Sequence, residues 1–154
     1  MTLKIIIAGV ISIASANYII CGYEEKTVGN TSEQGQVPIM EKVKKAVILA
    51  AGFGTRVLPA SKAIPKEMLN IVDKPAIQYI VEEVINSGIT EILIVLSRGK
   101  QEVEDHFDRK PDLEAQLLAG GKTEFYKVVC DIAEMGKNIT YVRQQTQNGT
   151  GGAV

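Results

Sequence analysis

The pattern of apolar and polar positions predicts alternating strands and helices from about residue 43 onward. Runs of consecutive apolar residues, typical of buried parallel strands, occur at 46–50 and 91–96, and a shorter strand is predicted at 139–143. Apolar residues at helical spacing between the first two runs predict a helix that begins near Pro75 and ends at Gly88. Further helices are predicted at 101–107, 112–119 and 122–134. Strand, helix and strand in this order form a βαβ unit, so the sequence predicts an α/β fold with a mostly parallel sheet.

The first 42 residues follow a different pattern. A basic start, an apolar run and Ala14-Ser15-Ala16 imitate a secretory signal peptide, and extension of the run to Cys21 approaches the length of a membrane span. Residues 4–9 can also be interpreted as a β-strand. Residues 24–42 are polar and contain scattered glycine, asparagine, serine and proline, which predicts a linker. We therefore expect 1–42 to be a poorly packed extension, with the folded domain at 43–154.

Composition narrows the class of protein without naming its chemistry. The 154 residues suffice for one domain with a core, and the contents of 45% apolar and 23% charged residues are ordinary for a soluble protein. The formal net charge of −1 gives no indication of a nucleic-acid surface. Cys21 and Cys130 lie far apart and lack metal-binding spacing, which argues against a zinc site and favours a reduced cytosolic setting.

The clearest chemical signal follows the first strand of the domain, in the segment Ala51-Gly52-Phe53-Gly54-Thr55-Arg56. Two glycines two positions apart let the backbone turn tightly and bring its N–H groups close to an anion. Arg56 adds a fixed fork of donors, Thr55 a hydroxyl group, and Lys66 a mobile positive charge. This combination predicts polyphosphate binding, although neither the P-loop pattern nor the third glycine of the dinucleotide fingerprint is present.

Residues 43–154 resemble the sugar-nucleotide pyrophosphorylases, in particular their bacterial UTP–glucose-1-phosphate uridylyltransferase branch. The matching segments are 50–56, 58–60, 62–69, 72–75, 77–79, 104–108 and 142–144. The resemblance implies a Rossmann-like nucleotidyltransferase fold with three layers, α/β/α. It also implies a fold that is incomplete at the C-terminus, because the family continues with a strand that supplies a metal-binding aspartate and with a sugar-binding half.

The resemblance also implies the reaction and the residues that perform it. Glucose 1-phosphate would attack the α-phosphorus of UTP, and pyrophosphate would leave. Arg56 and Lys66 would be the catalytic residues. The expected nucleotide-binding residues are Ala51, Gly52, Gly54, Thr55, Glu67, Gln144 and Gly149. A glutamine offers both a donor and an acceptor, as the edge of uracil requires. The loop departs from the family pattern at Thr150 and Gly152, where leucine and histidine are usual.

Several of these residues also have a purely structural interpretation. Thr55 could stabilise the turn, Glu67 could be a helix-start carboxylate, and Gln144 could be a polar strand end. His106, the only histidine, is expected to be structural, and Asp73 is expected to cap the helix that starts at Pro75.

The resemblance further implies Mg²⁺ as the cofactor, with no metal-binding residue inside this chain, and UTP and glucose 1-phosphate as the substrates. No nucleic-acid or membrane partner is expected, and the full-length enzyme is expected to be a cytoplasmic homo-oligomer. Two alternatives stay open: a catalytically silent nucleotide-binding fragment, and a thymidylyltransferase-type relative.

Overall fold

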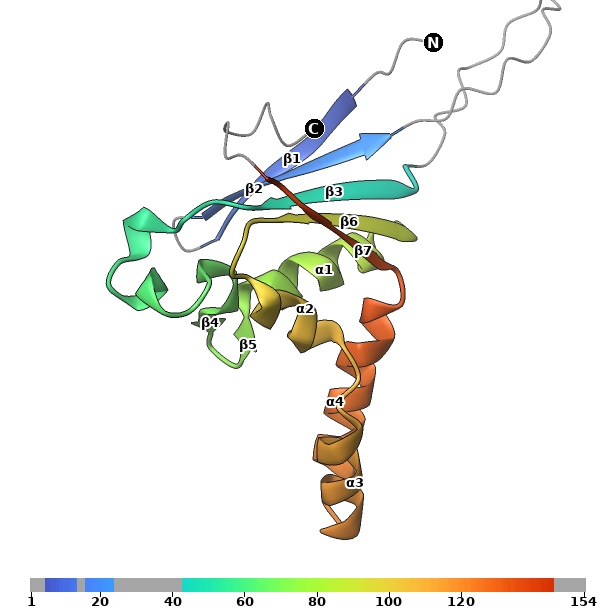
Figure 1. Ribbon diagram of the computed structural model, residues 1–154. Helices are drawn as coiled ribbons and strands as arrows, with labels where there is room; N and C mark the ends of the chain where they lie inside the picture. Colours follow the sequence, from blue (N-terminus) through green and yellow to red (C-terminus); the bar gives the residue numbers. More distant parts are fainter. Residues whose placement is uncertain (1–4, 14–15, 24–42, 146–154) are drawn as a thin grey trace, which may run out of the picture.

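A five-stranded sheet forms the frame of the molecule (Figure 1). The computed structural model describes residues 5–13 and 16–23 as backbone strands and residues 43–145 with their side chains. The strand order is β1-β2-β3-β6-β7. The bounds are Ile5–Ile13 for β1, Ala16–Tyr23 for β2, Lys45–Ala50 for β3, Glu91–Leu96 for β6 and Ile139–Arg143 for β7. Strands β3, β6 and β7 are parallel, which confirms the predicted α/β arrangement.

Helices α1 and α2 lie against one face of this sheet (Figure 1). The helices are α1 (Ala76–Asn86), α2 (Gln101–Phe107), α3 (Pro111–Ala119) and α4 (Thr123–Gly136). Between β3 and α1 the chain forms three 3₁₀ turns and a small hairpin: η1 (Thr55–Val57), η2 (Ala60–Lys62), η3 (Lys66–Met68), β4 (Asn70–Ile71) and β5 (Lys74–Pro75). Of the three predicted layers, the described residues supply the sheet and one helical layer.

The core forms between α1 and the inner face of β3 and β6. Ile77, Ile80 and Val84 of α1 are buried against Ile48 and Ile94 of the strands. These are the apolar positions that the sequence pattern assigns to a helix and two strands. Helix α1 ends at Asn86, and Gly88, which follows the C-cap residue Ser87, has the predicted left-handed conformation with φ +80°.

The start of α1 differs from the prediction. Asp73 does not cap the helix, because Pro75 occupies the N-cap position without a side-chain hydrogen bond. Instead the Tyr79 hydroxyl donates a hydrogen bond of 2.6 Å to Asp73 Oδ1, and its oxygen also lies 3.0 Å from the carbonyl oxygen of Ile71. Tyr79 therefore fixes the hairpin against the first turn of the helix.

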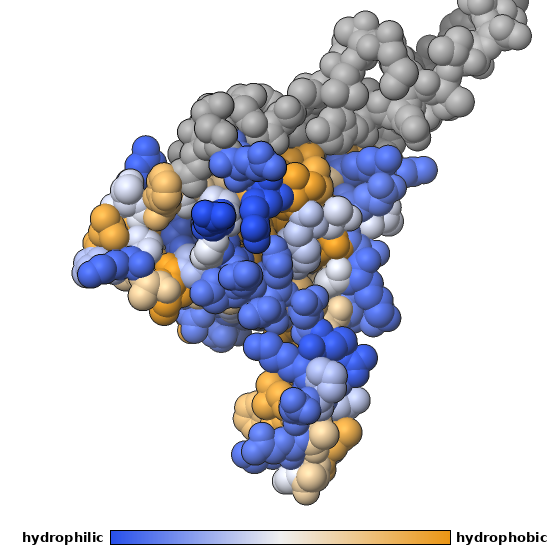
Figure 2. All heavy atoms as spheres, in the orientation of Figure 1, coloured by the Kyte–Doolittle hydropathy of each residue, from blue (hydrophilic) through white to orange (hydrophobic). Residues whose placement is uncertain are grey.

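Helices α3 and α4 form a hairpin that projects from the body of the molecule (Figure 1). Both helices lie where the sequence predicts them, but much of their apolar side-chain surface is exposed. Leu118, Phe125 and Val128 are 50%, 64% and 55% exposed, and apolar side chains are visible on the projecting part in Figure 2. The hairpin is joined to the body at Gly136, which packs against the backbone of Phe107.

The N-terminal strands extend the sheet beyond β3. Strand β1 pairs antiparallel with β2, and β2 pairs antiparallel with β3 through three residue pairs. The structure thus describes strands at Ile5–Ile13 and Ala16–Tyr23, whereas the signal, anchor and extension interpretations of residues 1–42 stay predictions. Among the helices of the described part, none has the length and apolar character needed to cross a bilayer. The predicted linker at 24–42 lies outside the described residues, and the division of the chain at residue 43 stays a prediction.

Candidate functional site

The two parts of the predicted site emerge at the same edge of the sheet. Because β3, β6 and β7 are parallel, Ala50, Leu96 and Arg143 pair across neighbouring strands at their carboxyl ends. The glycine-containing turn follows Ala50, and Gln144 follows Arg143 and donates its N–H to the carbonyl of Leu96 at 2.8 Å. Two strand spacings, about 10 Å, separate the two strand ends that carry these groups. This is the edge at which open α/β sheets bind ligands.

The turn depends on glycine at position 54 for two reasons. Gly54 has φ +72°, which side chains rarely adopt, and its carbonyl accepts hydrogen bonds from the N–H of Val57 at 3.0 Å and from Ser61 Oγ at 2.7 Å. A Cβ atom at Gly54 would lie 3.0 Å from Lys66 Cβ and 3.1 Å from Ser61 Cβ. The stem of Lys66 therefore packs directly against the turn.

The predicted cationic residues, Arg56 and Lys66, belong to η1 and η3, and both segments adjoin Gly54. Arg56 and Thr55 are exposed on η1, immediately after Gly54, and Lys66 begins η3 with its side chain 15% exposed. No acidic side chain of residues 43–145 lies within ion-pair distance of the Arg56 guanidinium. The charge of Arg56 is thus not compensated by a carboxylate within that range.

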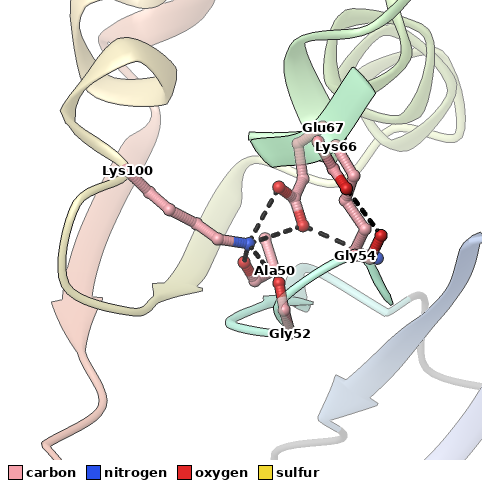
Figure 3. A network of polar contacts seen from close by, with 7 residues as sticks. Ala50, Gly52, Gly54, Lys66, Glu67 and Lys100 are labelled. Carbon is pink, nitrogen blue, oxygen red and sulfur yellow. Dashed lines mark hydrogen bonds and ion pairs between the residues drawn. The ribbon is translucent and has the colours of Figure 1, made fainter. Parts of the chain in front are cut away.

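A buried lysine that the sequence analysis did not single out lies beneath the turn. Lys100 is 7% exposed, and its Nζ donates to both carboxylate oxygens of Glu67 at 2.8 Å (Figure 3). The same ammonium donates to the carbonyl of Gly52 at 2.8 Å and to the carbonyl of Ala50. It therefore joins the end of β3, the turn and η3 to the loop before α2.

Glu67 connects this buried group to Lys66. Its carboxylate is fully buried, and Oε1 also lies 3.6 Å from Lys66 Nζ. Burial lowers the pKa of Lys100 below its ordinary value, and the charge of Glu67 opposes that shift. With both oxygens at hydrogen-bond distance from Lys100, Glu67 lies at the predicted site but below its surface. Its predicted contact with the nucleotide stays a prediction.

Sequence reasoning missed Lys100 because it lies 33 residues from Glu67 and 50 from Ala50. A lysine is ordinarily solvated, so no local pattern indicates its burial. The available signal was topological: Lys100 follows strand β6 at the same carboxyl edge as the glycine turn.

At the other end of the site, Gln144 carries an unsatisfied donor. Its Nε2 is buried and has no hydrogen-bond partner among the residues that the structure describes. A buried amide without a partner is costly in a finished fold, so such a group suits a ligand acceptor. Gly149, the other residue expected to read uracil, lies outside the described residues. The structure brings the remaining predicted residues, Ala51 to Arg56, Lys66 and Glu67, together around the turn.

The described residues do not form a metal site of their own. Within them, no three histidine, cysteine, aspartate or glutamate side chains come together so that they could hold an ion. Glu67, whose carboxylate lies beside both Lys66 and Lys100, accepts hydrogen bonds from Lys100 at both of its oxygens.

Comparisons with known proteins agree with this geometry. UTP–glucose-1-phosphate uridylyltransferase YngB of Bacillus subtilis is 60% identical over 114 residues, which are 74% of this chain and 38% of the relative. A second UTP–glucose-1-phosphate uridylyltransferase of the same species is 53% identical over 115 residues, 75% of this chain and 39% of the relative. A solved structure described as UTP-bound UGPase from Acinetobacter baumannii superposes with a TM-score of 0.68 at 44% identity, covering 71% of this chain and 39% of that one.

The chain thus spans about two fifths of the length of these relatives. Residues 45–154 match the model of the family described as nucleotidyl transferase. Because that match covers most of the chain, and because the α/β fold and the glycine turn agree with it, the chain belongs to the nucleotidyl transferase family.

Proposed function

We propose that this chain is the nucleotide-binding part of a UTP–glucose-1-phosphate uridylyltransferase and that the turn at 51–56, with Lys66, binds the triphosphate of UTP. The observation that carries the proposal is the packing of Lys66 against Gly54, the residue that directly precedes Thr55 and Arg56 of η1. A left-handed glycine turn after β3, together with two cationic residues in the segments that adjoin it, supports binding of a polyphosphate. The names of the relatives, one of them solved with UTP, support the choice of nucleotide.

In this proposal the protein contributes position and charge. The phosphate of glucose 1-phosphate attacks the α-phosphorus of UTP, the bond to the β-phosphate breaks, and pyrophosphate leaves. Arg56 and Lys66 stabilise the negative charge on the phosphates, as cations do in other phosphoryl transfers. Ala51, Gly52, Gly54 and Thr55 supply backbone and hydroxyl contacts around the nucleotide.

The uracil end of the nucleotide would lie toward β7. There the buried Nε2 of Gln144 is the donor available for a uracil carbonyl, and Gly149 would lie near the base. Glu67 is proposed to act at the same site. Comparison of UTP with dTTP tests this assignment, because a thymidylyltransferase-type relative must accommodate the 5-methyl group.

The remaining parts of the proposal rest on the family. Nucleotidyltransferases of this kind generally use a divalent metal, and we propose Mg²⁺, which would accompany the phosphates of UTP. The described residues offer no ligand set for the ion, so no step is assigned to it. We further propose that the full-length enzyme is a cytoplasmic homo-oligomer without nucleic-acid or membrane partners.

Calorimetry of the 154-residue chain with UTP and Mg²⁺ tests the binding proposal. We expect UTP to bind, dTTP to bind more weakly, and Lys66→Ala to weaken the affinity for UTP. In the longer enzyme, Lys66→Ala should lower kcat/KM by about 10²–10⁴, the effect of a lost contact to transition-state charge. The matched control is Lys45→Ala. Lys45 is an exposed lysine at the start of β3, and its ion pair is with Glu91 of β6. Near-normal kcat/KM in Lys66→Ala would contradict the assignment.

A pyrophosphate-release assay with UTP and glucose 1-phosphate addresses the silent-fragment alternative. UTP binding without turnover by the 154-residue chain would support that alternative for this polypeptide. Turnover by the chain would exclude it.

A further inference from the structure

The loop that leaves the central strand β6 lies between the two parts of the proposed nucleotide site. It begins after Leu96, whose carbonyl accepts the N–H of Gln144 at 2.8 Å. It ends at Lys100, whose ammonium donates to the carbonyl of Gly52 at 2.8 Å (Figure 3). Residues 97–99 therefore connect the end of the site that carries Gln144 with the end that carries the glycine turn.

Arg98 is the charged residue that this loop exposes. Ser97 before it is buried and Lys100 is bound beneath the turn, whereas Arg98 and Gly99 are exposed. Gly99 has φ +77°, and a Cβ atom there would meet nothing within 4 Å. No acidic side chain of residues 43–145 lies within ion-pair distance of the Arg98 guanidinium. Within the described part of the chain, its donors are therefore not engaged by a carboxylate.

The order of the strands corresponds to the order of the parts of a nucleotide. The proposed triphosphate site follows β3, and Gln144, the proposed contact of uracil, follows β7. Strand β6 lies between them, at one strand spacing of about 5 Å from each. Because the ribose joins the base to the triphosphate, a nucleotide bound in this way would place its ribose over the end of β6. Dinucleotide-binding α/β folds likewise use a charged side chain to recognise a ribose hydroxyl group.

We propose that Arg98 makes the site selective for ribonucleotides by donating a hydrogen bond to a hydroxyl group of the ribose; the proposal rests on the proposed binding of UTP. A guanidinium has five N–H donors and no acceptor, so a hydroxyl oxygen is a suitable partner. A hydrogen bond from a charged donor is stronger than one between neutral groups. Removal of the hydroxyl group from the ligand and removal of the guanidinium from the protein would abolish the same bond, so their effects should not add.

Calorimetry of the full 154-residue chain with UTP, dUTP and 3′-deoxy-UTP, each with Mg²⁺, tests this role. The wild-type chain should bind at least one of the two deoxynucleotides about tenfold more weakly than UTP, the effect of one hydrogen bond to a charged group. In Arg98→Met the corresponding ratio of Kd values should fall to about one, because the bond is already absent. A general loss of stability or of positive charge would affect all three nucleotides alike and would leave the ratio unchanged.

Control variants separate Arg98 from other groups. Lys45→Met removes an exposed positive charge at the start of β3, at the other end of the strand from the turn, and should leave the ratio at its wild-type value. Glu102→Gln removes the first carboxylate after β6, a group that can also bond to a ribose hydroxyl, and should leave the ratio unchanged as well. Arg98→Ala should abolish the discrimination as Arg98→Met does, and covers the case in which Arg98→Met does not fold.

The possible results distinguish this proposal from the proposed function. UTP binding without discrimination against either deoxynucleotide, or with the same discrimination in Arg98→Met, would overturn the role of Arg98 alone. Discrimination that disappears in Glu102→Gln would also overturn it. An equal loss of affinity for all three nucleotides in Arg98→Met would indicate a contact with phosphate and would overturn the ribose contact. A wild-type chain that does not bind UTP would contradict the proposed function, and the ribose contact with it.

Discussion

Replacement of Gly54 by alanine should destabilise the protein more than the same change at another left-handed glycine. At Gly54 the added Cβ meets Lys66 Cβ at 3.0 Å and Ser61 Cβ at 3.1 Å, whereas at Gly121 it meets nothing within 4 Å. The two glycines have φ +72° and +68°, so the cost of a left-handed alanine, about 1–2 kcal/mol, is common to both. The stability gained because alanine makes the unfolded chain less flexible is also the same for both variants. The difference then measures crowding against Lys66, about 1–3 kcal/mol.

Urea unfolding, followed by circular dichroism, gives both free energies of unfolding. We expect Gly54→Ala to lose about 1–3 kcal/mol more than Gly121→Ala. Gly54→Ala should also weaken UTP binding, because the displaced atoms include the stem of the proposed phosphate-binding lysine. Gly99→Ala provides a second control, since φ is +77° there and the space is open. Equal losses at all three positions would show that Lys66 does not pack against the turn.

Three further predictions concern other parts of the molecule. Gly136→Ala should lower the free energy of unfolding by about 2–3 kcal/mol, because its Cβ would lie 2.3 Å from the carbonyl oxygen of Phe107; a loss below that at Gly121 would contradict this packing. Val72→Asn should raise the free energy of unfolding by about 1 kcal/mol, since exposed Val72 has φ +64° and asparagine tolerates that conformation; a loss in urea unfolding would refute the strain. Burial, with a smaller contribution from Lys110, holds the pKa of His106 below its ordinary 6.5, so the unfolded chain binds the proton more readily. The stability that the neutral His106 contributes is therefore complete above pH 6.5 and is lost as the pH falls through the lower pKa of the folded state. Urea unfolding between pH 5 and 8 should show a free energy of unfolding that decreases toward low pH, and His106→Gln should reduce this decrease.

Much of the sheet and its first helix could be predicted because their signals are local. The apolar runs at 46–50 and 91–96 became β3 and β6, since strands buried on both faces need consecutive apolar residues. The helical spacing before Gly88 became α1, and the predicted helix 101–107 has those bounds in α2. The glycine turn was predictable because each of its residues carries its chemistry in its own side chain or backbone.

Other features depend on contacts between distant residues. The burial of Lys100 is decided by Glu67 and by two carbonyls, none of which lies near it in the sequence. The sequence predicted the helices α3 and α4, but no local signal indicated that their hairpin projects from the body and leaves Phe125 exposed. The pairing of β2 with β3 likewise joins strands that the polar segment 24–42 separates in the sequence, so no local pattern predicted it.

The contact beneath the glycine turn also bears on the order of folding. The ammonium that closes it comes from the segment that follows β6, so loop closures of 33 and 50 residues must precede the finished turn. Amides of the turn should therefore become protected from hydrogen exchange only after β6 has docked beside β3. Nucleotide affinity would then appear late in refolding, as the last property that the βαβ unit acquires.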